Sequence, residues 1–173
     1  LFNIEINLSY VGDQATQIEW AHDSAWRFLP TVHSPEFGYC LHPLDLAINK
    51  VLALAGRDEP RDLLDTLHVH QDVLPLGSLC WAAAGKDPGF TPLSLLELLR
   101  RRGKVRPEEL ARLHLVRPVD LQQLKSAWLQ ALDQAEAFVR SRPPEELGCL
   151  YYSTSAEAFI APTGAEGEDA TPH

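Results

Sequence analysis

Residues 45–65, DLAINKVLALAGRDEPRDLLD, decide the fold of most of this chain. They continue an apolar stripe with the three- and four-residue spacing of a helix, made of Leu44, Ala47, Ile48, Val51, Leu52 and Ala55. Gly56 is a typical helix terminator, and Glu59-Pro60 begins a second helix with inward-facing leucines. We therefore expect two packed helices whose turn gathers ionic side chains on one rigid surface, namely Lys50, Arg57, Arg61, Asp62 and Asp65.

Helical patterns continue beyond this pair. They predict a third helix over residues 75–84, a fourth from Thr91-Pro92 to Gly103, and a fifth, short one at residues 106–109. The longest, over about residues 119–140, is stopped by Pro143 and Pro144. The sequence therefore predicts a helical bundle over residues 42–142.

The chain before residue 42 has a different pattern. Residues 2–10 alternate apolar and polar side chains, which indicates a half-buried strand. Residues 19–28 predict a strand that leads into a short helix ended by Pro30, and residues 31–41 predict an extended segment that reverses near Pro35 and Gly38. The predicted fold class is α+β, with a β-rich part over residues 1–41, the bundle, and an acidic tail over residues 143–173. We expect a short extended piece at 149–152 and disorder over 163–173.

Composition limits the function classes. A formal net charge of -9 argues against broad, nonspecific nucleic-acid binding, which needs clustered lysine and arginine. Three cysteines far apart in sequence, without a preceding secretory leader, favour reduced thiols and a cytoplasmic location. No apolar run approaches the length of a membrane span, so no membrane partner is expected.

The ionic residues of the helix pair allow two interpretations. In the first, Arg57 and one aspartate tie two antiparallel helices together, while Lys50 only extends its head to solvent. In the second, Lys50 reaches an anion such as a triphosphate, and the Arg/Asp set holds that lysine in place. The spacing alone leaves both open.

The same residues resemble a known family. The run DLA-I-NK-V-LAL at 45–54, followed by Arg57 and by RDLLD at 61–65, resembles the region after the catalytic core in nucleotidyltransferases of the AbiEii/AbiGii toxin type. These belong to the DNA polymerase β-like superfamily. The run EWAHDSAWRF at 19–28 with Pro30 is similar to a subgroup of bacterial relatives. The resemblance extends over about residues 2–142.

The resemblance implies transfer of a nucleoside monophosphate from an NTP to a tRNA or protein acceptor. It implies that Lys50 and Arg57 contact the nucleotide, that Arg61, Asp62 and Asp65 support them, and that Glu5 matches the third carboxylate of a two-metal Mg²⁺ site. The chain lacks the family's Gly-Ser loop and its Asp-x-Asp pair on a strand. One glutamate cannot hold two hard cations, so we expect this chain by itself to be inactive. A solvent-facing Glu5 on the polar side of its strand is the alternative.

Other patterns are weaker. His22, Asp23 and Ser24 are adjacent and point in different directions, so they cannot form a catalytic relay. His68 and His70 could bind a metal together only on a strand. Arg100–Arg102 with Lys104 is the one basic cluster in the sequence, and we expect it to complement a helix end, with contact to nucleic acid as the alternative. The rival function is a non-catalytic helical module that binds a partner protein such as an antitoxin.

Overall fold

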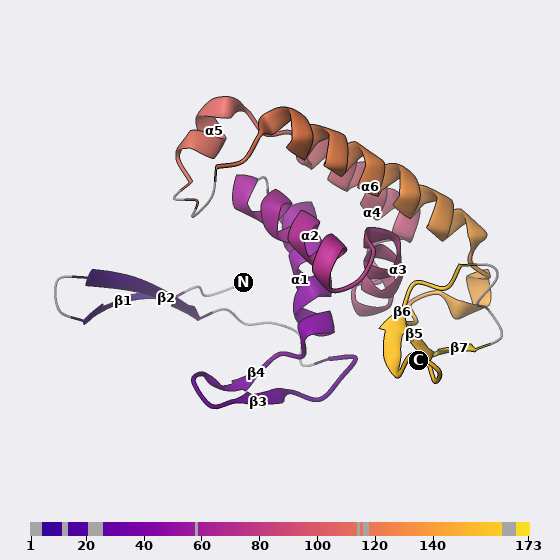
Figure 1. The fold of residues 1–173 in the computed structure, drawn as a ribbon. Coiled ribbons are helices and arrows are strands. Elements are labelled where there is room, and N and C mark those ends of the chain that lie inside the picture. The colour runs from indigo at the N-terminus through magenta and orange to yellow at the C-terminus, as the bar shows by residue number, and fades with distance from the viewer. Residues whose placement is uncertain are drawn as a thin grey trace.

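The structure is a computed structural model. It describes residues 5–11, 14–20, 26–57, 59–113, 115, 118–163 and 169–173, and for residues 5–20 it describes the backbone alone. The described part is α+β, with small antiparallel strand pairs followed by helices, which confirms the predicted fold class (Figure 1).

Two hairpins precede the helices. Strands β1 (Glu5–Val11) and β2 (Gln14–Trp20) pair antiparallel, with residue 5 opposite residue 20. Strands β3 (Val32–Ser34) and β4 (Gly38–Cys40) form the second pair. The strand expected at residues 2–10 and the reversal near Gly38 are thus confirmed where the structure describes them, and the burial of the strand's side chains stays a prediction.

The short helix expected before Pro30 is wrong for its described residues. Residues 26–30 are irregular, and residues 21–25 lie outside the described part. The physical reason is that two backbone amides of this segment have an acceptor outside it. Those of Phe28 and Leu29 donate to the side chain of Asp45, at 2.9 and 3.1 Å, instead of to carbonyls one helical turn back.

The predicted helices are all present in the described part. They are α1 (Pro43–Gly56), α2 (Pro60–Asp72), α3 (Leu76–Lys86), α4 (Pro92–Arg102), α5 (Pro107–Ala111) and α6 (Leu121–Ser141). Their starts follow local chemistry. Thr91 and Ser94 form a reciprocal capping box at α4, and Asp120 accepts the Gln123 amide at α6, at 2.8 Å.

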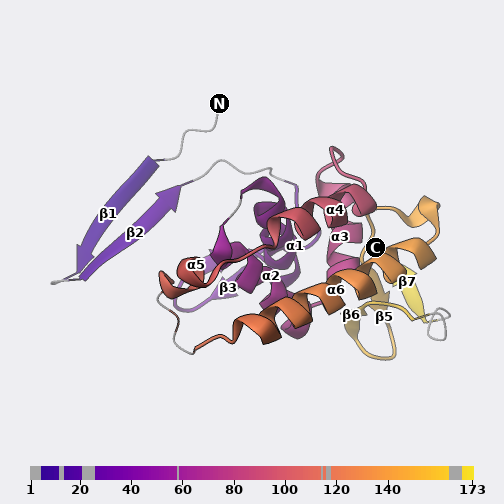
Figure 2. The same cartoon turned by 90° about the horizontal axis from the view of Figure 1, so that it is seen from above.

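Helix α3 lies at the centre of the bundle. Its residues from Leu76 to Ala84 are all buried, because α1, α2, α4 and α6 pack around it. Helix α6 lies across α3 and α4, as two perpendicular views show (Figures 1 and 2). No described helix is both long and apolar enough to span a bilayer.

A small sheet follows the bundle. After the 3₁₀ turn η1 (Pro144–Glu146), strand β5 (Tyr151–Ser153) pairs antiparallel with β6 (Ala158–Ile160) and with β7 (Ala170–Pro172). The disorder expected for residues 163–173 is therefore wrong for the described residues 169–173. Side-chain hydrogen bonds hold residues 169–173 in place, and amino-acid composition does not predict these bonds.

Asp169 accepts several of these hydrogen bonds. The hydroxyls of Ser155, Thr154 and Ser153 and the Ser155 amide donate to its carboxylate and hold the pKa of that carboxyl well below its usual range. Because the pKa is lower in the folded state, this contribution to stability is present above the ordinary value of 3.8 and is lost as the pH falls below it.

We expect Asp169→Asn to loosen β7. The measurement is hydrogen exchange at Leu150 and His173, whose backbone groups bond each other at 2.9 and 2.7 Å. Protection of these amides should fall several-fold in the variant at pH 6, and in the wild-type chain between pH 5 and pH 3. The exposed neighbour Glu157 provides the control Glu157→Gln, which should change nothing. Unchanged protection in Asp169→Asn would contradict this role.

Candidate functional site

The candidate site lies where α1 and α2 pack against each other. Lys50 projects from α1, and its ammonium donates to the Asp65 carboxylate on α2 at 2.7 Å. Both side chains are about one-third exposed, at 32% and 34%. The pair is thus partly desolvated and still open to solvent, and its geometry holds the Lys50 charge at a defined point on the helix pair.

Arg57 and Asp62 form the second ion pair. The guanidinium donates through Nε and Nη2 to the two Asp62 oxygens, at 2.6 and 3.1 Å. Asp62 is almost fully buried, at 1% exposure, whereas Arg57 is 61% exposed. Two parallel bonds to a buried carboxylate fix the turn between α1 and α2. This agrees with the interpretation that Arg57 and an aspartate tie the two helices together.

Neighbouring contacts hold the backbone of Lys50. The hydroxyl of buried Thr66 donates to the Lys50 carbonyl at 3.3 Å, and Lys86 of α3 donates to the side chain of Asn49. At the start of α1, the fully buried Asp45 accepts the two amides of residues 28 and 29. The result is a rigid frame under the Lys50 side chain.

Two predicted site residues are not brought into this cluster by described contacts. Arg61 is exposed on the first turn of α2, and no ion pair joins it to another described residue. Glu5 begins β1, and its side chain lies outside the described part of the chain. Its role as a metal ligand therefore stays a prediction.

The remaining sequence candidates have structural roles or lie outside the described residues. His70 Nδ1 accepts the Leu76 amide at the start of α3, at 2.9 Å, and burial lowers the pKa of His70. His68 instead contacts Asp72 at the exposed face of α2. The segment 22–24 is not described. Arg100–Arg102 occupy the last turn of α4, the helix end that they were expected to complement.

The described residues also bear on the expected Mg²⁺ and thiols. Among them, no group of three or more histidine, cysteine, aspartate or glutamate side chains gathers as a metal site would require. The described donor set therefore does not fit the implied Mg²⁺ pair by itself. Cys40, Cys80 and Cys149 are free thiols, and burial raises the pKa of Cys80.

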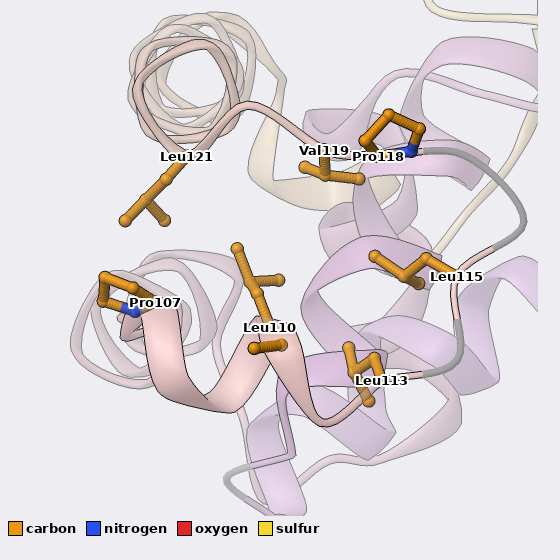
Figure 3. A pocket seen from close by; sticks show the side chains of 8 residues that line it. Pro107, Leu110, Leu113, Leu115, Pro118, Val119 and Leu121 are labelled. Atoms are coloured by element: carbon orange, nitrogen blue, oxygen red, sulfur yellow. The ribbon is translucent and has the colours of Figure 1, made fainter.

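An open cavity of about 500 Å³, lined by apolar side chains, lies beside α5 and the start of α6. Figure 3 shows Pro107, Leu110 and Leu121 pointing toward one another, with Leu113, Leu115, Pro118 and Val119 contributed by the connecting segment. Leu115 and Val119 are 39% and 38% exposed. The described lining carries no charged side chain, which suits apolar contact rather than catalysis.

Comparisons with models of protein families, with curated proteins and with solved structures found no match. The description of this protein therefore depends on the geometry of its own fold and site. It is an α+β protein whose helical body carries two ion pairs across one helix hairpin.

Sequence reasoning missed several residues of this frame. In the sequence Asp45 is only the first residue of the motif at 45–54, yet in the structure it anchors the segment before α1. Its position in the first turn of a helix signals a favourable dipole interaction but not its distant partners. Thr66 and the Asn49–Lys86 contact had no signal in spacing, because each joins residues far apart in the chain.

Proposed function

We propose that this chain provides the helical part of a toxin-like nucleotidyltransferase, which transfers a nucleoside monophosphate from an NTP to a tRNA or protein acceptor. In this proposal Lys50 and Arg57 contact the nucleotide. The observation that carries the proposal is the Lys50–Asp65 pair, rigidly held and one-third exposed. It is supported by the resemblance of residues 45–65 to the AbiEii/AbiGii toxin type.

The chemistry assigned to Lys50 follows from its donor count. An ammonium has three N–H donors, and the bond to Asp65 uses one of them. The others remain for phosphate oxygens that approach from the solvent side. The hydrogen bond to Asp65 orients the ammonium before the nucleotide arrives, so less rotamer entropy is lost on binding. During transfer the same charge offsets the negative charge that develops on the phosphates.

Arg57 is the second nucleotide contact, and Asp62 and Arg61 have supporting roles. The buried Asp62 holds Arg57 by two bonds, which sets the direction of the exposed part of the guanidinium. Arg61 adds positive charge at the start of α2. Glu5 is proposed as the one metal ligand that this chain contributes, and no step for Lys50 depends on it.

Removal of the Lys50 ammonium tests the proposal directly. Calorimetric titration of the chain with ATP, GTP, CTP and UTP, each with Mg²⁺, should reveal binding of at least one. We expect Lys50→Ala to weaken that binding by about tenfold, the loss of one charge-assisted hydrogen bond. Asp65→Asn should weaken it less, because the ammonium remains but is no longer oriented.

The matched control is Arg101→Ala, which removes an exposed positive charge from α4 that belongs to neither ion pair of α1 and α2. Its NTP affinity should equal that of the wild-type chain. Circular dichroism would establish that all variants keep their helices. NTP binding that is unchanged in Lys50→Ala, or no binding of any NTP by the wild-type chain, would contradict the proposal.

The cavity beside α5, with its apolar side chains, favours a second candidate function, a non-catalytic module that binds a partner protein such as an antitoxin. A partner side chain of leucine or phenylalanine type fits its lining of proline, leucine and valine. The same titration separates the two candidates, since the module requires no NTP. A module would also tolerate Lys50→Ala and lose its partner with Leu115→Asp.

A further inference from the structure

Another cavity, of about 440 Å³, lies between the C-terminal end of α4 and the first half of α6. Its apolar surface comes from Val105, Trp128 and Leu129. Val105 and Trp128 are buried, whereas Leu129 is 52% exposed. Such a size and lining suit a small molecule with an apolar body.

The indole N–H of Trp128 is an unusual feature of this cavity. The side chain is 3% exposed, and its Nε1 atom is buried without a hydrogen-bond partner in the described part of the chain. Trp81, which is also buried, instead donates its indole N–H to the Glu146 carbonyl at 2.8 Å. A buried donor without an acceptor costs free energy, so the Trp128 N–H favours any ligand that brings an acceptor.

Gly103 determines where that donor lies. A Cβ atom at this position would be 2.1 Å from Nε1 of Trp128. The lack of a side chain therefore lets the edge of the indole reach the end of α4, where Gly103 and Lys104 line the cavity. Any larger residue at 103 would displace the ring.

Positive charge surrounds the same cavity. Arg100 lines it but is engaged by Asp133 and Glu136, at 3.2 and 3.6 Å. Lys104 and Lys125 also line it, both are exposed, and no carboxylate of the described residues lies within ion-pair distance of either. The other two lysines of the chain, Lys50 and Lys86, are bonded to neighbouring helices.

We propose that this cavity binds a small amphipathic carboxylate. Its apolar body covers Val105 and Leu129, and its carboxylate lies between the ammonium groups of Lys104 and Lys125. A carboxylate oxygen also accepts the hydrogen bond that Trp128 lacks. Because Nε1 is covered in the free protein, the edge of the ring turns toward the ligand on binding. A local pair of lysines in a chain of net charge -9 selects an anion at this place. The proposal is independent of the nucleotide role of Lys50.

The test uses two probes that share an apolar body, 1-naphthaleneacetate and its neutral analogue 1-naphthaleneacetamide. The full chain, labelled with ¹⁵N, is titrated with each, and the four indole N–H resonances are followed, with Trp128 assigned by Trp128→Phe. The carboxylate should bind about tenfold more tightly than the amide, as two exposed ion pairs allow. The Trp128 resonance should move, and the bonded indole of Trp81 should not.

Matched variants distinguish binding at this cavity from nonspecific attraction of the anion to positive charge elsewhere on the protein. Lys104→Gln with Lys125→Gln should reduce the affinity for the carboxylate to that for the amide. Arg101→Gln with Arg112→Gln removes the same charge from exposed positions outside the cavity and should leave both affinities unchanged. Equal affinities for the two probes in the wild-type chain, no saturable binding of the carboxylate, or a stationary Trp128 resonance would each overturn the proposal.

Discussion

Asp45→Ala is expected to lower the free energy of unfolding by about 3 kcal/mol, because two charge-assisted hydrogen bonds are lost together. The Asp45 carboxylate is fully buried and accepts the amides of Phe28 and Leu29 at 2.9 and 3.1 Å. Its removal leaves both N–H groups without this acceptor in partly buried surroundings. Urea unfolding followed by far-ultraviolet circular dichroism measures the effect.

A conservative change and an exposed aspartate complete this test. Asp45→Asn keeps the shape but offers one side-chain oxygen in place of two, so it should lose about half as much stability. Asp133→Ala removes a carboxylate of α6 that is 71% exposed and should change stability by less than about 0.5 kcal/mol. If Asp45→Ala were as mild as Asp133→Ala, the carboxylate would not anchor the segment before α1.

The helices could be predicted because their signals are local. Apolar spacing shows which face of each helix is buried, and Glu59-Pro60 and Thr91-Pro92 mark starts that the structure confirms. The Arg57–Asp62 pair was one of two interpretations of the same spacing. The packing angle and distance between α1 and α2 decide which aspartate pairs with Arg57, and residue spacing does not give these quantities.

The parts that could not be predicted depend on contacts distant in sequence. The sequence before Pro30 is compatible with a helix, but the carboxylate of Asp45, sixteen or seventeen positions away, accepts the amides of Phe28 and Leu29. Residues 169–173 have the composition of a disordered tail, yet Asp169 meets hydroxyls from a turn fourteen to sixteen positions earlier. The sequence likewise predicts that Trp128 is buried in the core, but it does not predict that its indole N–H lacks a hydrogen-bond partner among the described residues.

Gly148→Ala is expected to cost about 3 kcal/mol of stability, because it combines backbone strain with steric overlap. Gly148 has a φ of +89°, in the left-handed region that disfavours side chains. A Cβ atom there would also lie 2.8 Å from Cα of Gly85 in α3, and one at Gly85 would lie 2.7 Å from the Gly148 carbonyl oxygen. Both obstacles are backbone atoms, which cannot rotate away as a side chain does.

The two glycines thus bring η1 and the sheet that follows it into direct contact with the central helix. Gly85→Ala should cost less, about 1–2 kcal/mol, because alanine gains helix propensity that offsets part of the overlap. The double variant should cost less than the sum of the two, since either methyl group alone already separates the same two backbones.

Gly56→Ala is the matched control, since a Cβ at this helix end meets nothing within 4 Å and the backbone is not left-handed. It should leave stability unchanged or raise it by up to about 1 kcal/mol. Thermal and urea unfolding of the four variants provide the comparison, with the near-ultraviolet signal of Tyr151 and Tyr152 reporting on the sheet. A Gly148→Ala chain as stable as Gly56→Ala would show that α3 and residue 148 do not meet as closely as 2.8 Å.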